Sequence, residues 1–365
     1  MHRESAFSPP TATLTVSPVV RSQPWMMGGV LGLLLICFAL DLAWGSVHIP
    51  LGDVISVLAG QAVENSAWTT IVLDFRLPKA LTALLAGFAL ATSGLQMQTF
   101  FRNPLADPYI LGVSSGASLG VALMLLNAGA AGSFLLSGLG MLGSLGVAFA
   151  ACLGAGLVMG IMLIVSRRGR SVLLLLILGI MFSYMTGALV SLLFYFSSPE
   201  RIQAYLVWSF GSFGGTTWQE IKVMAPLVAL GLLVTFLLSK PLNALLLGEM
   251  YARSMGVNVE RTRFSVIAST SLLAGAVTAF CGPIAFLGLA VPHLARGLFK
   301  TSDHRILVPA CGLLGACLGL AADVASQLPG ANVILPLNAV MSLIGAPAVI
   351  WVLLRQYRLK GDSPL

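Results

Sequence analysis

Ionisable side chains inside apolar stretches are the first place where this sequence could do chemistry. Asp41 and Asp323 each interrupt a long apolar run near one of its ends, and intramembrane acids of this kind can carry protons or ions. His293 and His304 lie in "VPHLAR" and "DHR", without the spacing of a metal site. The sequence also contains no GxSxG, HExxH or GxxxxGK[ST] pattern. These residues therefore give little support to catalysis or to ATP binding by this chain.

The amino-acid composition indicates the class of protein. The chain has 365 residues, of which 57% are hydrophobic and 9% charged, whereas soluble domains average about 25% charged residues. A cytosolic enzyme is therefore excluded. Backbone groups must be paired in lipid, which leaves helical bundles and closed barrels. Barrel strands alternate apolar and polar residues, but runs such as 171–196 are continuously apolar. We predict an all-α, polytopic membrane protein.

About ten apolar segments are long enough to be transmembrane helices. A Ser-, Thr- and Pro-rich tail at 1–23 precedes a single transmembrane domain at 24–356, and a short tail follows at 357–365. The predicted spans are 25–44, 80–100, 108–126, 135–165, 172–196, 221–239, 264–281, 284–299, 306–326 and 335–354.

The positions of basic residues predict the orientation, because Lys and Arg accumulate in cytoplasmic loops. With the N-terminus inside, only four of the 20 lysines and arginines fall on the outer side, namely Arg76, Lys79, Arg201 and Lys222. The net charge of +7 is therefore interpreted as topology and not as nucleic-acid binding. Both termini and their tails are predicted to be cytoplasmic.

Glycines recur at a spacing of four, which places them on one face of a helix. The sets are Gly112, Gly116 and Gly120; Gly156 and Gly160; and Gly315 and Gly319. Small residues let helices approach closely in lipid, so we expect tight helix packing at these positions.

Two polar interruptions stand out on the predicted inner side. The first is "RNPLADP" at 102–108, where Pro104 cannot continue a preceding helix. Asp107 would then lie near the N-terminus of the next helix, as in a capped helix start. The second, at 240–263, is predicted to form short amphipathic helices. These either lie on the lipid headgroups or dock a cytosolic partner.

Several motifs together resemble the FecCD-type permeases. They are "RLPKALTALLAGFALATSG", "FRNPLADPYILGVSSGASLG", "LNALLLGEMYARSMGV", "IAFLGLAVPHLAR", "DHRILVPACGLLGA" and "LIGAPAVIWVLLR", in this order between about 70 and 356. These proteins are the membrane subunits of ABC importers for ferric siderophores, haem and vitamin B12.

The resemblance implies a set of partners. A homodimer of ten-helix subunits would sit in the bacterial inner membrane, with two cytosolic ABC ATPase subunits below and a periplasmic substrate-binding protein above. It implies no cofactor on this chain, since ATP and Mg²⁺ would be used by the ATPase partner.

Residue roles follow from the same motifs. Gly248, Glu249, Ala252 and Arg253 would lie on coupling helices that transmit closure of the ATPase. Glu249 and Arg253 alone could also form an ordinary i,i+4 ion pair, and both interpretations can hold at once.

The resemblance also implies residues at each end of a pathway. Asn103 and Leu105, together with Ser171 and Ile177, would narrow its cytoplasmic end. The alternative is that residues 102–108 are only a capped helix start. Arg76 and Lys79 would pair with acidic residues of the binding protein, although they could also anchor a helix end. A further basic docking position of the vitamin B12 permease would fall near Gln327, which is neutral here.

The expected function is therefore import of an iron chelate, either a ferric siderophore or haem. Vitamin B12 is the alternative cargo. From other classes, an ion-coupled secondary transporter would need buried mid-membrane acids, and a membrane enzyme would need clustered His, Asp or Glu.

Overall fold

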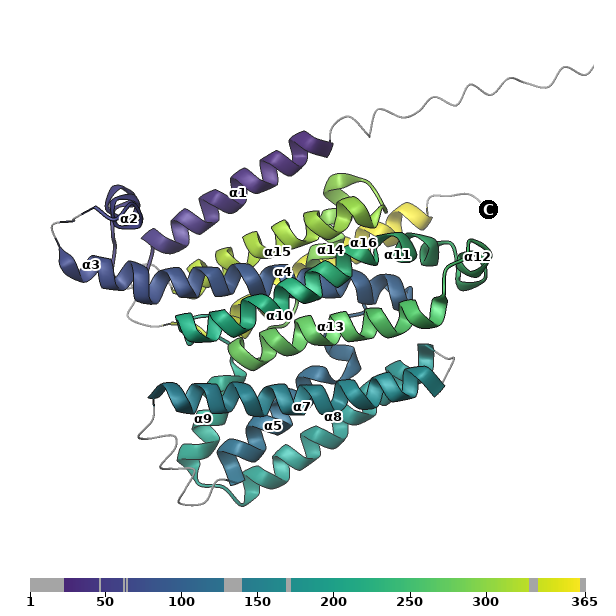
Figure 1. Ribbon diagram of the computed structural model, residues 1–365, viewed down its shortest axis with the longest axis horizontal. Coiled ribbons are helices and arrows are strands. Elements are labelled where there is room, and N and C mark those ends of the chain that lie inside the picture. Colours follow the sequence, from purple (N-terminus) through teal and green to yellow (C-terminus); the bar gives the residue numbers. More distant parts are fainter. Residues whose placement is uncertain are drawn as a thin grey trace, which may run out of the picture.

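The computed structural model describes residues 23–45, 47–61, 63, 65–127, 140–168, 172–327 and 334–361. Over these residues the regular structure is helical and contains no strand (Figure 1). The elements are α1 (Gln23–Ala43), α2 (Leu51–Leu58), α3 (Ser66–Thr70), the π-helix η2 (Ile71–Arg76), α4 (Leu77–Phe101), the 3₁₀ helix η3 (Pro108–Leu111), α5 (Val113–Asn127), α7 (Gly140–Arg168), α8 (Val172–Tyr195), α9 (Pro199–Ser209), α10 (Trp218–Leu237), α11 (Ser239–Leu246), α12 (Glu249–Ser254), α13 (Val259–Cys281), α14 (Leu287–Phe299), α15 (His304–Ser326) and α16 (Leu337–Gly361).

Seven helices of the described chain are long and apolar enough to cross a membrane. They are Pro24–Ala43, Ser66–Phe101, Gly146–Ser166, Leu173–Tyr195, Trp218–Leu237, Val259–Cys281 and His304–Ser326. Three shorter apolar helices cover Val113–Leu126, Leu287–Phe299 and Leu337–Pro347. Each of the ten predicted segments overlaps one of these helices. The number that cross the bilayer, and the side on which the termini lie, stay predictions. The predicted tail at 1–23 lies almost wholly outside the described residues, as do residues 362–365.

Local signals in the sequence set the helix ends. Asn258 and Asp303 cap α13 and α15 by accepting hydrogen bonds from the N–H groups of Arg261 and Arg305, both at 2.9 Å. Helix α4 ends at Arg102, which adopts a left-handed conformation with φ of 49° just before Pro104.

Helix α4 is the centre of the bundle. It continues α3 and η2 without a break, so that Ser66–Phe101 forms one helix of 36 residues. Helices α10, α13, α14 and α15 pack around it (Figure 1). A Cβ on Gly87 of α4 would lie 2.2 Å from the carbonyl oxygen of Gly315 on α15, so this contact requires glycine.

A second layer contains α5, α7 and α8, and α13 joins it to the layer around α4 (Figure 1). Close glycine contacts hold this layer together as well. A Cβ on Gly116 would lie 2.5 Å from the Gly154 carbonyl oxygen, and one on Gly120 would lie 2.1 Å from that of Ala150. The packing predicted from glycine spacing is present here and at Gly315.

The same prediction is wrong for Gly156 and Gly160 within this chain. A Cβ on either would meet no atom within 4 Å. Both glycines lie on a face of α7 that its neighbours leave uncovered, because spacing alone does not tell which face of a helix is buried.

The bundle has two distinct ends, which we name by their short helices. The α2–α3 end is at one side of Figure 1, and the α11–α12 end is at the other. The sequence predicted the first as the periplasmic end and the second as the cytoplasmic end.

Candidate functional site

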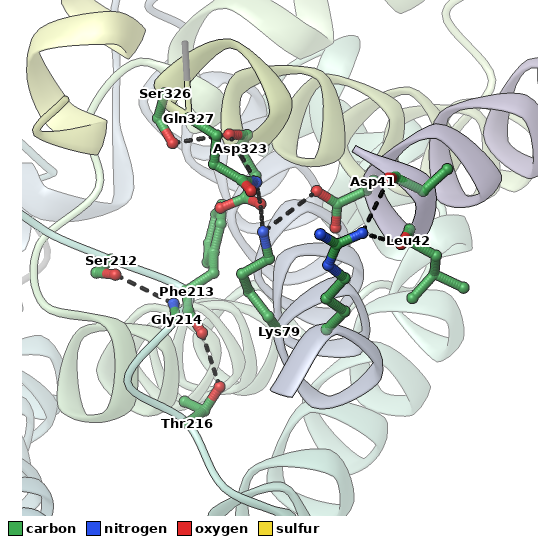
Figure 2. Close-up of polar contacts among 12 residues, drawn as sticks. Asp41, Leu42, Lys79, Ser212, Phe213, Gly214, Thr216, Asp323, Ser326 and Gln327 are labelled. Carbon is green, nitrogen blue, oxygen red and sulfur yellow. Dashed lines mark hydrogen bonds and ion pairs between the residues drawn. The ribbon is translucent and has the colours of Figure 1, made fainter. Parts of the chain in front are cut away.

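Two buried acids enclose a lysine at the α2–α3 end. Lys79 Nζ lies 2.5 Å from Asp323 Oδ2 and 3.6 Å from Asp41 Oδ1, so three helices meet through one ammonium group (Figure 2). The side chains are 14%, 7% and 0% exposed, respectively. Neither oxygen of Asp41 has a hydrogen-bond partner among the described residues. Among the described residues, Lys79 is the cation that forms an ion pair with Asp41, and we call Asp41, Lys79 and Asp323 the ionic triad.

Arg76 lies one helical turn before Lys79 and is also directed into the protein. Its guanidinium donates hydrogen bonds to the carbonyl oxygens of Leu42 at 2.8 Å, Ala43 at 2.9 Å and Val47. Only 6% of its surface is exposed. Arg76 thus satisfies the free carbonyls at the C-terminal end of α1, where a cation is favourable.

The sequence did not predict this inward placement. Arg76 and Lys79 were expected to pair with a binding protein, and that role stays a prediction. The neutral Gln327 is also used internally, since its amide donates to Asp323 Oδ2 at 2.8 Å. A cavity of about 510 Å³ reaches Lys79, Asp323 and Gln327.

At the opposite end, residues 102–108 form a well-bonded elbow between α4 and η3. Asp107 caps η3 by accepting the Tyr109 N–H at 2.9 Å, which is the geometry expected of a capped helix start. The Nε2–H of His293 donates to the Pro104 carbonyl oxygen at 2.8 Å. The Asn103 side chain accepts the Leu105 N–H at 3.0 Å.

The predicted gate residues that the structure describes lie on two parts of the chain, the elbow and α8. Leu105 and Ile177 are each 45% exposed, so both present apolar surface within this chain. Asn103 is half-buried and bonded within the elbow. Ser171 lies outside the described residues. The gating role of all four stays a prediction.

Helices α11 and α12 form most of the stretch where short amphipathic helices were predicted, while its last residues, 259–263, begin α13. We call α11 and α12 the coupling segment. Gly248 joins them at φ of 120°, a conformation that other residues rarely adopt. Ala252 is fully buried in a small core with Ala244 and Leu245, so it supports the segment from inside.

The i,i+4 ion pair that the sequence offered as an alternative is not the one that forms in the coupling segment. Glu249 Oε1 lies 3.2 Å from Arg263 Nη2 on α13, instead of pairing with Arg253. The Arg253 side chain is exposed and forms no ion pair with another described residue. Several residues near it in the chain expose apolar side chains, namely Leu246, Leu247, Met250, Tyr251 and Met255.

A hydrogen-bonded chain connects the coupling segment to the end of α4, and sequence reasoning missed it. Asn243 Oδ1 lies 2.7 Å from His304 Nδ1, and His304 Nε2 lies 2.8 Å from Thr99 Oγ1. Asn243 Nδ2 also donates to Asp303 Oδ1 at 2.6 Å. Arg102 adds a second connection by donating to the Leu245 carbonyl oxygen at 3.0 Å. Polar residues within apolar motifs were the available signal, since buried polar groups need partners.

The described residues contain no group of three or more His, Cys, Asp or Glu side chains that could hold a metal ion.

Comparisons with known proteins agree with the architecture and with these motifs. The model of the FecCD transport family matches residues 33–355. The chain is 37% identical over 336 residues to the vitamin B12 import system permease protein BtuC of Klebsiella pneumoniae, covering 92% of this chain and 95% of the relative. The protein of the same name from an Escherichia coli strain is 37% identical over 320 residues, covering 86% and 94%.

A solved structure is similar over nearly the whole chain. It is described as an inward-facing conformation of a metal-chelate type ABC transporter, and it matches with a TM-score of 0.79 and 28% identity. The match covers 91% of this chain and 99% of that chain. Because the FecCD family model matches residues 33–355, which is most of this chain, the chain belongs to the FecCD transport family.

Proposed function

We propose that this chain is the transmembrane permease subunit of an ATP-binding-cassette importer that moves a metal chelate into the cytoplasm. The observation that carries the proposal is the correspondence with permease proteins over 92% of this chain and 95% of the relative. A match of that extent includes both ends of the bundle and the segments between them. The subunit would act as a homodimer in the bacterial inner membrane.

The coupling segment supports an ATPase partner. It carries exposed apolar side chains close in the chain to an exposed arginine, and contiguous apolar surface rimmed by polar groups is typical of protein interfaces. Two ATPase subunits would bind there, while a periplasmic binding protein would deliver cargo at the α2–α3 end. Transmission would be a rigid-body movement of helices.

Cobalamin is the first choice of cargo, and ferric chelates are the second. The sequence motifs favoured an iron chelate, but the relatives at 37% identity are vitamin B12 permeases. The solved structure described as a metal-chelate type transporter supports the wider class. Cobalamin is itself a metal chelate, so both choices belong to that class.

The experiment is uptake into lipid vesicles that contain the permease, its ATPase and its binding protein. Cyanocobalamin, a ferric siderophore and haem would be offered separately, with and without ATP. ATP-dependent uptake of cyanocobalamin supports the proposal in full, and uptake of an iron chelate alone would move the cargo to the second choice. Uptake driven by a proton gradient without ATP would overturn the importer class in favour of a secondary transporter.

A further inference from the structure

We propose that Thr99, His304 and Asn243 form a positioning relay, which fixes the coupling segment against the end of α4 and makes its movement reach the elbow. The inference rests on the proposed function, because it assigns the route by which an ATPase partner would act. Thr99 lies three residues before Arg102, so the relay ends where the elbow begins. The three residues come from α4, α15 and α11.

The hydrogen positions in the relay follow from its partners. Asn243 Oδ1 accepts the backbone N–H of His304 at 2.9 Å, which identifies this atom as the amide oxygen. His304 Nδ1 at 2.7 Å must therefore carry a hydrogen and donate to the same oxygen. In the neutral ring Nε2 is then an acceptor, and the Thr99 hydroxyl at 2.8 Å is its donor, although this hydroxyl also lies 2.9 Å from the Leu95 carbonyl oxygen of its own helix. A methyl group in place of the Thr99 hydroxyl could not donate this hydrogen bond.

The relay is buried, so losing one of its hydrogen bonds is costly. His304 is 1% exposed and Thr99 is 3% exposed, so water has little access to the bond between them. A buried acceptor that loses its donor carries a desolvation cost. Leu242 and Leu245 of α11 are also buried, but contacts between apolar side chains have little directional preference. The direction of the segment is fixed by the relay, by the bond from Asn243 Nδ2 to Asp303 Oδ1 and by the bond from Arg102 to the Leu245 carbonyl oxygen.

A matched pair of variants on α4 tests whether the Thr99 hydroxyl helps to position the coupling segment. Thr99→Val removes the hydroxyl that His304 uses. Thr92→Val removes an equally buried hydroxyl, 1% exposed, whose hydrogen bonds go only to the carbonyl oxygens of Phe88 and Ala89 in its own helix. Thr99→Ser restores the donor and should behave as the native protein.

The first measurement uses the purified permease and needs no partner. Spin labels would replace the exposed Leu247, at the end of α11, and the exposed Leu298, on α14, in a background lacking the five native cysteines. We expect a broader distribution of label distances in Thr99→Val, and an unchanged one in Thr92→Val and Thr99→Ser. Equal distributions in Thr99→Val and the native protein would overturn the relay.

The second measurement is cargo imported per ATP hydrolysed in the complete transporter. Coupling free energies of this kind correspond to factors of about 5 to 150, so Thr99→Val should lower the ratio about fivefold or more while Thr92→Val does not. An unchanged ratio would refute transmission through the relay. If the native complex imported nothing with ATP while the label distances still broadened, the proposed function would fail and the positioning role would stand.

Discussion

Removing the ammonium of the ionic triad should destabilise the protein strongly. In Lys79→Met the side chain keeps a similar length, but Asp41 and Asp323 lose the cation at 3.6 Å and 2.5 Å. Both carboxylates are almost fully buried, and Asp41 has no hydrogen bond among the described residues. Removing one member of a buried ion pair typically costs about 3–5 kcal/mol, because the remaining charge is left uncompensated. Lys79 is 14% exposed, so we expect about 3 kcal/mol, the lower end of that range.

The assay is reversible unfolding of the purified permease in mixed micelles, and Lys222→Met is the control. Lys222 is exposed on α10, so its replacement should change the free energy of unfolding by less than about 0.5 kcal/mol.

A combined variant separates lost charge balance from lost packing. Asp41→Asn, Lys79→Met and Asp323→Asn together remove every charge of the triad and nearly preserve the shape of each side chain. The triple variant should therefore recover much of the stability that Lys79→Met loses, because contacting residues are not additive. The reasoning is refuted if Lys79→Met is as stable as Lys222→Met, or if the triple variant is no more stable than Lys79→Met.

Three further outcomes are expected. Arg253→Glu should weaken binding of the ATPase subunits and uncouple ATP hydrolysis from uptake while the permease keeps its fold, and normal coupling would exclude Arg253 from the interface. Gly87→Ala should lower the free energy of unfolding by about 1–3 kcal/mol through overpacking, since its Cβ would lie 2.2 Å from a backbone oxygen, whereas Gly156→Ala meets no atom within 4 Å and serves as the matched control. Leu105→Trp should slow cargo release in the vesicle assay if its half-exposed side chain lines the pathway, and unchanged uptake kinetics would leave the elbow with a capping role alone.

The helices could be predicted because their signals are local. Ten apolar runs, the break at Pro104 and the short amphipathic helices after Lys240 each depend on residues close together in the chain. The same is true of the capping role of Asp107, which involves a residue two positions away.

Partners that come from distant helices could not be predicted. Asp41 and Asp323 were placed near the predicted outer ends of their helices, but nothing in the sequence pairs them with Lys79 across 38 and 244 positions. The i,i+4 spacing of Glu249 and Arg253 allowed an ion pair between them, but the fold pairs Glu249 with Arg263. The packing predicted for Gly156 and Gly160 is wrong within this chain for a related reason. Helical spacing identifies residues that share a face, but not the neighbour that covers that face.

The unbroken course of α4 restricts how this family member can vary in length. Lys79 belongs to the ionic triad and Thr99 to the relay, and the helix between them has no interruption. One inserted or deleted residue would turn one end by about 100° relative to the other and shift it by about 1.5 Å. Either the triad or the relay would then lose its partners. Substitutions between the two residues can be tolerated one at a time, but a change of register cannot, so viable insertions and deletions should be confined to the connections outside this helix.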